Sequence, residues 1–201
     1  MLDVGSGRTP TIPIGARPDG ARYVGLDVSS EELAKAPPGS YDDVVVADVT
    51  DLRPELSDRF DLVISFQVFE HVRSMRQALQ NIHAYLGRGG DVVVYTSATF
   101  AWFGLANRLV PISVTRALQE RLMAVDPGKV FPAYYDHCWY AALHHELRGW
   151  TNVEVVPLYL GAQYFNFAPP LRRAYLLYED WARRSRHRNL ATHYVFRARK
   201  P

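Results

Sequence analysis

Glycine and aspartate residues near the start of this sequence are spaced in a way that can build a ligand site. Residues 2–7 read LDVGSG, which places Asp3 before a turn with glycine at positions 5 and 7. Glycine lets the backbone approach a ligand closely because it has no Cβ atom. Asp27 ends a second apolar run and Asp48 lies at the end of a third. Carboxylates at these places can accept hydrogen bonds from sugar hydroxyls and from an amino group.

The same turn lacks the features that bind a pyrophosphate. A dinucleotide site needs a helix N-terminus facing the phosphates and commonly reads G-x-G-x-x-G, but the third glycine of that pattern is Pro10 here. Pro13 and Pro18 follow, without an apolar stripe of helical period. We therefore expect a nucleoside ligand that has no phosphate. S-adenosylmethionine is such a ligand, whereas a nicotinamide dinucleotide is disfavoured.

Short apolar runs alternate with helical patterns, which predicts a mostly parallel sheet with crossover helices. The runs are rich in Val and Ile and barely alternate, as is typical of strands covered on both faces. Ser29 and Glu32 form a capping-box pattern at the start of the first helix. Predicted helices cover 30–36, 69–86, 140–149 and a segment that starts at Pro169–Pro170. Predicted strands cover 1–4, 22–28, 42–49, 60–66, 90–97, 152–160 and 192–200.

The composition is that of a soluble globular protein. The 201 residues are 48% hydrophobic and 22% charged, without an apolar run long enough to cross a membrane. Cys138 is the only cysteine, which excludes a disulfide framework and a cysteine metal site and fits a cytoplasmic protein. The sequence shows no linker or internal repeat, so we predict one domain over residues 1–201.

Positive charge is concentrated toward the C-terminus. Residues 161–201 carry nine Lys and Arg against two acids, a net charge of +7, while residues 1–160 carry 14 against 19, a net charge of −5. A basic region of this kind can contact phosphates or anionic lipid, so RNA binding and peripheral membrane contact both stay open. A solvated helix face beside a basic final strand explains the same residues.

Five segments, in order, resemble the motifs of class I S-adenosylmethionine-dependent methyltransferases. They are LDVGSG, YVGLDVS, VVADVTDL, FDLVISFQVFEHV and YLGRGGDVVVYTS, and they lie within residues 1–97. The sequence is most similar to the group that includes ubiquinone-biosynthesis methyltransferases. The resemblance implies an α/β, Rossmann-like, doubly wound fold with a mostly parallel seven-stranded sheet. Its last strand would be antiparallel and inserted beside the sixth, with helical insertions after the fifth and sixth strands.

The resemblance also implies which residues hold S-adenosylmethionine. Asp3 would orient the turn and approach the methionine amino group, Asp27 would hold the ribose hydroxyls, and Asp48 would accept from the adenine amino group. Each acid also has a simpler explanation, as part of a turn, as a helix cap, or as a loop acid. The predicted cofactor-binding residues are Asp3, Gly5, Ser6, Gly7, Asp27, Val28, Asp48, Val49, Ser65, Phe66 and Gln67.

The sequence departs from the family pattern around the first strand. The family turn often reads D-x-G-x-G-x-G, and its third glycine is Thr9 here. The first crossover helix is shortened or absent. Family members have a helix before the first strand, whereas Met1 already lies inside that strand here. We expect residues 98–140 and 161–190 to be insertions that cover the site and shape an acceptor pocket.

Candidates for proton transfer lie mainly in the segment AYYDHCWYAALHHE, residues 133–146. A base is needed where the methyl acceptor must lose a proton. His137 is the candidate base, with Asp136 beside it. His71 matches the family's EH pair and is a third candidate, although a histidine at a helix start is more often a packing residue than a base. The sequence has no recognised zinc spacing, so we predict no metal.

We predict an enzyme that transfers a methyl group from S-adenosylmethionine to a small-molecule or glycan-type acceptor, at oxygen. Tyr134, Tyr135 and Trp139 can form an aromatic wall for that acceptor or pack in a core. The alternative is an RNA or other nucleic-acid methyltransferase that uses the basic C-terminal region. A noncatalytic cofactor-binding protein is a third class, which the acids at 3, 27 and 48 disfavour.

Overall fold

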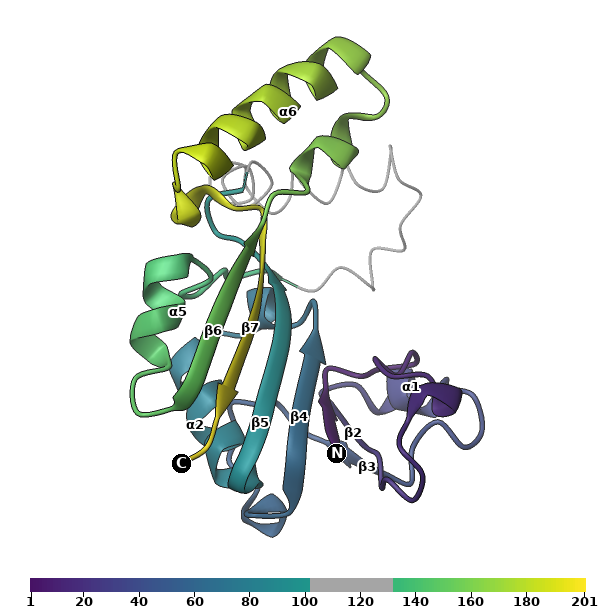
Figure 1. Ribbon diagram of the computed structural model, residues 1–201. Coiled ribbons are helices and arrows are strands. Elements are labelled where there is room, and N and C mark those ends of the chain that lie inside the picture. The colour runs from purple at the N-terminus through teal and green to yellow at the C-terminus, as the bar shows by residue number, and fades with distance from the viewer. Residues whose placement is uncertain (102–131) are drawn as a thin grey trace.

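The computed structural model describes residues 1–101 and 132–201, which contain a seven-stranded sheet (Figure 1). The strand order is β3-β2-β1-β4-β5-β7-β6, with β7 antiparallel to both of its neighbours and the other pairs parallel. This confirms the predicted Rossmann-like α/β fold and the insertion of the last strand beside the sixth. The strands are β1 Leu2–Val4, β2 Val24–Asp27, β3 Asp43–Val46, β4 Phe60–Phe66, β5 Leu86–Ser97, β6 Thr151–Leu158 and β7 His193–Arg199.

The order of the strands reverses at β1. Strands β2 and β3 lie to one side of it and β4 to the other. Val4 is in register with Leu26 of β2 and with Ser65 of β4, so three carboxyl ends meet at the same level. An open parallel sheet has a crevice at such a point, and ligands bind there.

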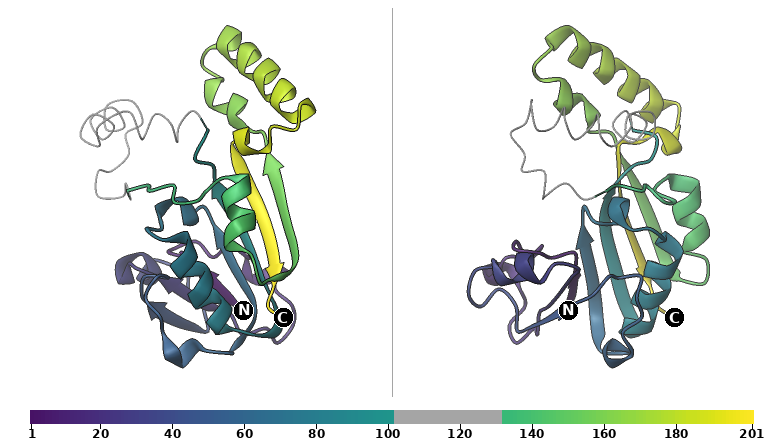
Figure 2. Two further views of the ribbon diagram at one scale, coloured as in Figure 1. Left: turned by 90° about the vertical axis from the view of Figure 1, so that its left-hand side faces the viewer. Right: turned by 180° about the vertical axis from the view of Figure 1, so that it is seen from behind.

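Helices α2 (Met75–Tyr85) and α5 (Tyr140–Glu146) lie on one face of the sheet (Figure 2). Their buried side chains pack against the strands, and the rings of Phe69 and Phe196 meet edge to face at 6.0 Å. Full burial of one such apolar side chain stabilises the fold by about 1.5–3 kcal/mol. This layer therefore holds the strand ends that form the crevice.

Helix α1 (Ser30–Ala34) follows β2 and begins as its sequence predicts. The Ser29 hydroxyl accepts from the backbone N–H of Glu32 at 3.2 Å. The second half of the capping box is absent, because the Glu32 carboxylate pairs with Arg8 at 2.6 Å. The backbone N–H of Ser29 donates instead to Asp27 at 2.8 Å. Helix α1 is thereby tied to the glycine turn.

Helix α2 begins later than predicted. The sequence predicts one helix over 69–86, but Phe69–His71 forms a 3-10 turn, η3, and Val72 is extended. The α-helix starts only after Ser74, whose hydroxyl accepts from the Gln77 N–H at 3.3 Å. The Met75 N–H donates to Asp136 at 2.8 Å, a contact with a distant segment that periodicity does not reveal.

Most of the predicted insertion over 98–140 lies outside the described residues. The predicted insertion over 161–190 forms η5 (Gly161–Phe165), α6 (Pro169–Arg184) and η6 (Arg188–Leu190). Pro169 and Pro170 occupy the first turn of α6, as predicted. None of the helices within the two described ranges is both long and apolar enough to cross a bilayer. A further 3-10 turn, η2, covers Pro54–Leu56.

The segment that joins β1 to β2 contains one short 3-10 turn, η1 (Ile14–Ala16), which confirms that the first crossover helix is reduced. Asp3 is fully buried and holds this segment. Its carboxylate accepts from the Thr11 N–H at 2.7 Å, from the Thr11 hydroxyl at 2.8 Å and from the Tyr23 hydroxyl at 2.7 Å. Arg17 lies 3.6 Å over the Tyr23 ring. Burial raises the pKa of Asp3, although the Thr11 hydrogen bonds oppose that effect.

We expect Asp3→Ala to lower the free energy of unfolding by about 2–4 kcal/mol, because buried donors on Thr11 and Tyr23 lose their acceptor. Asp3→Asn should lower the free energy of unfolding by only about 1 kcal/mol. The amide oxygen of Asn can accept two of these hydrogen bonds, and its NH2 group can donate to the Thr11 hydroxyl. Urea unfolding at one pH measures both variants, with Asp61→Ala as the exposed control. Equal losses for the Ala and Asn variants would contradict this account.

Candidate active site

A cleft of about 450 Å³ opens at the carboxyl ends of β1, β2 and β4. This is the point where the strand order reverses. Of the predicted cofactor-binding residues, seven line it: Gly5, Asp27, Val28, Asp48, Val49, Phe66 and Gln67. Its other lining residues are Val4, Leu26, Ala47, Val68, His71, Val72, Arg73, Pro132 and Tyr134. The remaining four predicted residues, Asp3, Ser6, Gly7 and Ser65, are not among its lining residues.

Gly5 forms the floor of the cleft, where any side chain would be blocked. Its φ is +72°, and an added Cβ would lie 2.1 Å from the Val68 side chain. Its N–H donates to the Leu26 carbonyl at 2.7 Å, which joins the turn to β2. The Val68 side chain, which also lines the cleft, therefore packs against the turn at a position that only glycine can occupy.

Asp27 connects the glycine turn to α1. One carboxylate oxygen accepts from the Gly7 N–H at 2.9 Å and the other from the Ser29 N–H at 2.8 Å. A carboxylate has about four acceptor positions, so both oxygens retain capacity toward the cleft. The N-cap of α1 is Ser29 and Asp27 accepts from its N–H, so the helix-cap explanation of Asp27 is not borne out, and its role in ligand binding stays a prediction.

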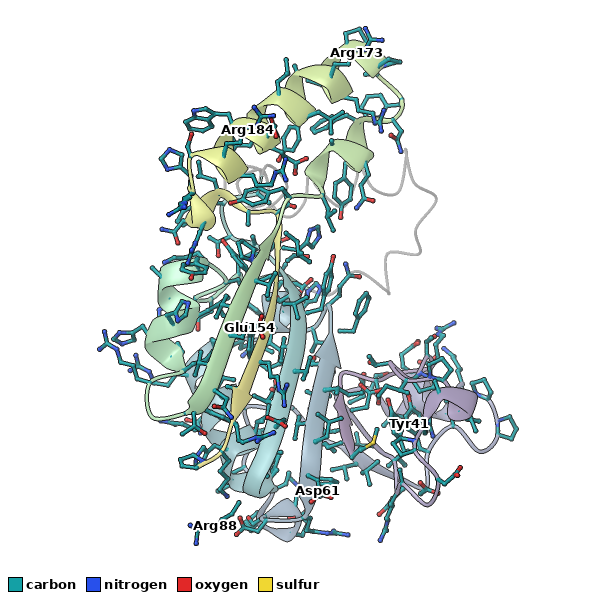
Figure 3. All side chains as sticks on the ribbon, viewed as in Figure 1. Tyr41, Asp61, Arg88, Glu154, Arg173 and Arg184 are labelled. Carbon is teal, nitrogen blue, oxygen red and sulfur yellow. The ribbon has the colours of Figure 1, made fainter. Side chains whose placement is uncertain are left out.

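Tyr41 supports the turn from below, a role that the sequence did not reveal. Its hydroxyl lies 3.2 Å from the Ser6 carbonyl and 3.0 Å from the Gly7 carbonyl (Figure 3). The ring passes over Gly25, where an added Cβ would come within 2.9 Å of it. The Ser6 side chain is buried at the same place, with no partner for its hydroxyl among the described residues.

Asp48 follows β3 and faces the cleft from a short turn. Its Oδ1 atom accepts from the N–H of Thr50 at 2.9 Å and from its hydroxyl at 2.8 Å. This fixes the carboxylate while Oδ2 keeps its acceptor positions. Val49 is buried beside it, and Val28 is 54% exposed at the cleft, so apolar surface flanks the acid.

Phe66 begins a row of aromatic rings that leads away from the cleft. Phe66 stacks on Tyr95 at 4.7 Å, Tyr95 on His193 at 5.3 Å, and His193 on Tyr164 at 6.5 Å. The first two residues are register partners in β4 and β5. Gln67 follows with φ +55°, and its N–H donates to the Tyr95 carbonyl at 2.8 Å. Of these four rings only Phe66 lines the cleft.

The three candidates for proton transfer are separated in the structure. His71 lines the cleft, with Nδ1 at 3.1 Å from the Pro132 carbonyl oxygen. Asp136 holds the start of α2, and His137 lies 2.7 Å from Glu146 of α5. Neither belongs to the cleft lining. His137 and Asp136 are neighbours in sequence, but their hydrogen bonds join α2 and α5.

Another hollow, of about 500 Å³, lies between α2 and α5, lined by residues such as His83, His145 and Trp150. It is remote from the carboxyl ends of the strands. At its border Glu146 pairs with Arg76 and with His137. The hydrogen bond from Arg76 lowers the pKa of Glu146. None of the predicted cofactor-binding residues lines this hollow. No group of three or more His, Cys, Asp or Glu residues within 1–101 and 132–201 is placed to hold a metal ion.

Comparison with known proteins gives one family match and many structural matches. Residues 2–94 match the family model described as methyltransferase domain. The CurJ carbon methyltransferase is 16% identical with a TM-score of 0.57, over 99% of this chain and 47% of that one. Phosphoethanolamine N-methyltransferase 2 of Haemonchus contortus is 16% identical with a TM-score of 0.59, over 100% of this chain and 48% of that one.

A S-adenosylmethionine-dependent methyltransferase from Archaeoglobus fulgidus is 16% identical with a TM-score of 0.55, over 99% of this chain and 85% of that one. This chain spans about half the length of the CurJ and Haemonchus proteins. No curated protein matches it. The strand order, the inserted antiparallel strand and the position of the cleft define the fold of class I methyltransferases. Residues 2–94, just under half of the chain, are thus similar to methyltransferase domains, and one of the structures that share this fold was solved in complex with S-adenosyl-L-methionine.

The polar side chains of the cleft suit S-adenosylmethionine, because carboxylates accept hydrogen bonds from hydroxyl and amino groups. Asp27 and Asp48 both line the cleft and offer carboxylate oxygens to it, beside the backbone of Gly5. Val28, Val49 and Phe66 supply apolar surface between them. A sulfonium nucleoside requires no helix N-terminus, and the segment after Gly7 forms none: it contains only the 3-10 turn η1 before β2.

The buried His193 predicts a dependence of stability on pH. Burial lowers its pKa from 6.5 to about 4. The unfolded chain binds a proton below pH 6.5 while the folded imidazole stays neutral, so stability is intact above 6.5 and falls toward pH 4. We expect a loss of about 2–3 kcal/mol from this residue.

The His193→Phe variant keeps a ring in the stack and should lose less stability between pH 6.5 and 4. Urea unfolding at a series of pH values measures the slope. The exposed His144→Phe variant should retain the slope of the parent chain. Identical slopes for His193→Phe and the parent would show that another group is responsible.

Proposed function

We propose that this chain transfers a methyl group from S-adenosylmethionine to an oxygen atom of a small-molecule or glycan-type acceptor. The observation that carries the proposal is the cleft in which Gly5, Asp27 and Asp48 meet at the reversal of strand order. Its volume of about 450 Å³ is in the range of small-ligand pockets rather than of open grooves. The single, buried Cys138 suits a reducing compartment, and we place the protein in the cytoplasm.

The predicted ligand contacts follow from the cleft. Asp27 would accept from the ribose hydroxyls and Asp48 from the adenine amino group, with Val28 and Val49 against the ring. Phe66 and Gln67 would adjoin the methionine portion. The other four predicted residues would act indirectly. Asp3 would hold the crossover, and Ser6 and Gly7 would shape the turn. Ser65 would shape the end of β4, where its hydroxyl donates to the Val4 carbonyl at 2.9 Å.

His71 is the residue we assign to proton removal from the acceptor. When bound, S-adenosylmethionine supplies a methyl group on a sulfonium, and its transfer breaks a C–S bond and forms a C–O bond. An acceptor hydroxyl must lose its proton in this reaction. Because a carbonyl only accepts, the contact with Pro132 assigns a hydrogen to Nδ1, so Nε2 is the atom that would take the proton of the acceptor. Arg73 donates to the Tyr134 hydroxyl at 3.1 Å on the same side of the cleft.

We expect Asp27→Ala to weaken binding of S-adenosylhomocysteine at least tenfold, about 1.4 kcal/mol, because it removes the acceptor for the ribose hydroxyls. Titration calorimetry on the folded variants measures this change. Asp43→Ala, an exposed acid of β3, is the matched control and should bind like the parent chain. Tight binding of NADH in place of S-adenosylhomocysteine would overturn the proposal.

Incubation of a cell extract with the protein and methyl-labelled S-adenosylmethionine should label a small hydroxylated molecule, identified by mass spectrometry. We expect His71→Ala to lower the rate about 100-fold, within the usual range for loss of a general base. His137→Ala should leave turnover unchanged. Loss of turnover in His137→Ala alone would reverse the assignment, and label on nitrogen or carbon would refute the choice of oxygen.

A further inference from the structure

Helix α6 extends away from the sheet, beyond the carboxyl ends of β4 and β5 (Figures 1 and 2). Its inner face is anchored. The buried Glu179 carboxylate accepts from the N–H groups of Gly161 at 2.7 Å and Ala162 at 3.2 Å, so it holds η5 against the helix. Tyr175 packs on Phe165 at 4.9 Å on this side. The helix therefore has a fixed orientation and a defined outer face.

The outer face carries apolar residues between arginines. Arg173, Leu177, Trp181 and Arg184 follow each other at helical spacing on one stripe. Leu177 is 73% exposed and Trp181 is 50% exposed. Phe167, just before the helix, is 82% exposed. Figure 3 shows Arg173 and Arg184 toward opposite ends of α6.

The charge at this end of the molecule is strongly positive. Of the two acids among residues 161–201, Glu179 is buried and Asp180 pairs with Arg183 and Arg184, each at 2.8 Å. Asp91 pairs with Arg197 and Arg199, and Asp58 pairs with Lys200, so the positive charge at this end comes from the arginines within residues 172–188. The acidic excess lies in residues 1–160.

We propose that α6 and Phe167 dock on the surface of a membrane that contains anionic phospholipid. The helix would lie in the plane of the interface, with Leu177, Trp181 and Phe167 at the boundary of the acyl chains. Arginine side chains would extend to the lipid phosphates, and tryptophan favours this depth. The cleft opens at the same end of the sheet as α6, so it would face the membrane region.

An RNA partner would explain the arginines but not the apolar residues. Binding of single-stranded RNA relies on aromatic rings that receive bases. Leucine offers no such ring, and Tyr175 packs inward. The Trp181 ring already lies 4.8 Å from His187 and 6.1 Å from Tyr178. Exposed aliphatic residues between cations are instead typical of helices at a lipid interface.

Co-sedimentation of the full chain with vesicles tests the proposal. Vesicles of equal parts phosphatidylcholine and phosphatidylglycerol should bind at least about tenfold more tightly than pure phosphatidylcholine. The double variant Leu177→Asp with Trp181→Asp should lose this binding, and Arg173→Glu with Arg184→Glu should lose it independently. Both pairs are exposed, and thermal melting checks that they fold.

Leu52→Asp and Arg88→Glu are matched controls and should bind vesicles like the parent chain. Leu52 is an exposed leucine, and Arg88 lies at the opposite end of the molecule (Figure 3). Absence of vesicle binding, or unchanged binding by both α6 variants, would overturn the proposal. Binding of a fluorescent single-stranded RNA without binding of vesicles, lost in the arginine variant, would assign the surface to RNA. None of these readouts depends on methyl transfer.

Discussion

The carboxylate of Asp3 determines whether the first strand can present its turn to the cleft. The crossover between β1 and β2 contains only the 3-10 turn η1. Here three hydrogen bonds to one buried acid fix the crossover, together with the ring of Tyr23 and the cation of Arg17. The glycine turn, the end of β2 and the start of α1 all depend on that anchor because they are attached to the same segment.

Asp27 and Arg8 extend this control from the crossover to α1. Asp27 joins the turn to the backbone that precedes the helix, and Arg8 joins the turn to Glu32 within it. The ion pair with Arg8 holds the pKa of Glu32 well below its usual range, at about 2. The two contacts make the turn and the helix a single unit, so the cleft has a stable wall although the helix has only five residues.

Much of this arrangement follows from local patterns. The order of apolar runs predicts the parallel sheet, and LDVGSG, Asp27 and Asp48 predict the position of the cleft. Long-range contacts are what the patterns do not contain. The apolar period over 69–86 predicts one continuous helix. It does not show the break before Met75, which depends on the hydrogen bond from the Met75 N–H to Asp136. Similarly, Asp136 and His137 have the chemistry of a catalytic pair, but the sequence does not show that their hydrogen bonds are made to Met75 of α2 and Glu146 of α5. Nothing near Tyr41 in the sequence links it to the glycine turn.

The two backbone hydrogen bonds of Asp27 have a consequence for how a ligand is received. A surface carboxylate normally samples several rotamers, and binding must select one of them. In this protein folding has already made that selection, so little conformational entropy remains to be lost on binding. The acid is therefore preorganised for binding, and we expect a ligand to bind without reorienting it. Evolution of the cleft toward other nucleosides would have to remodel the loop before it could reorient the acid.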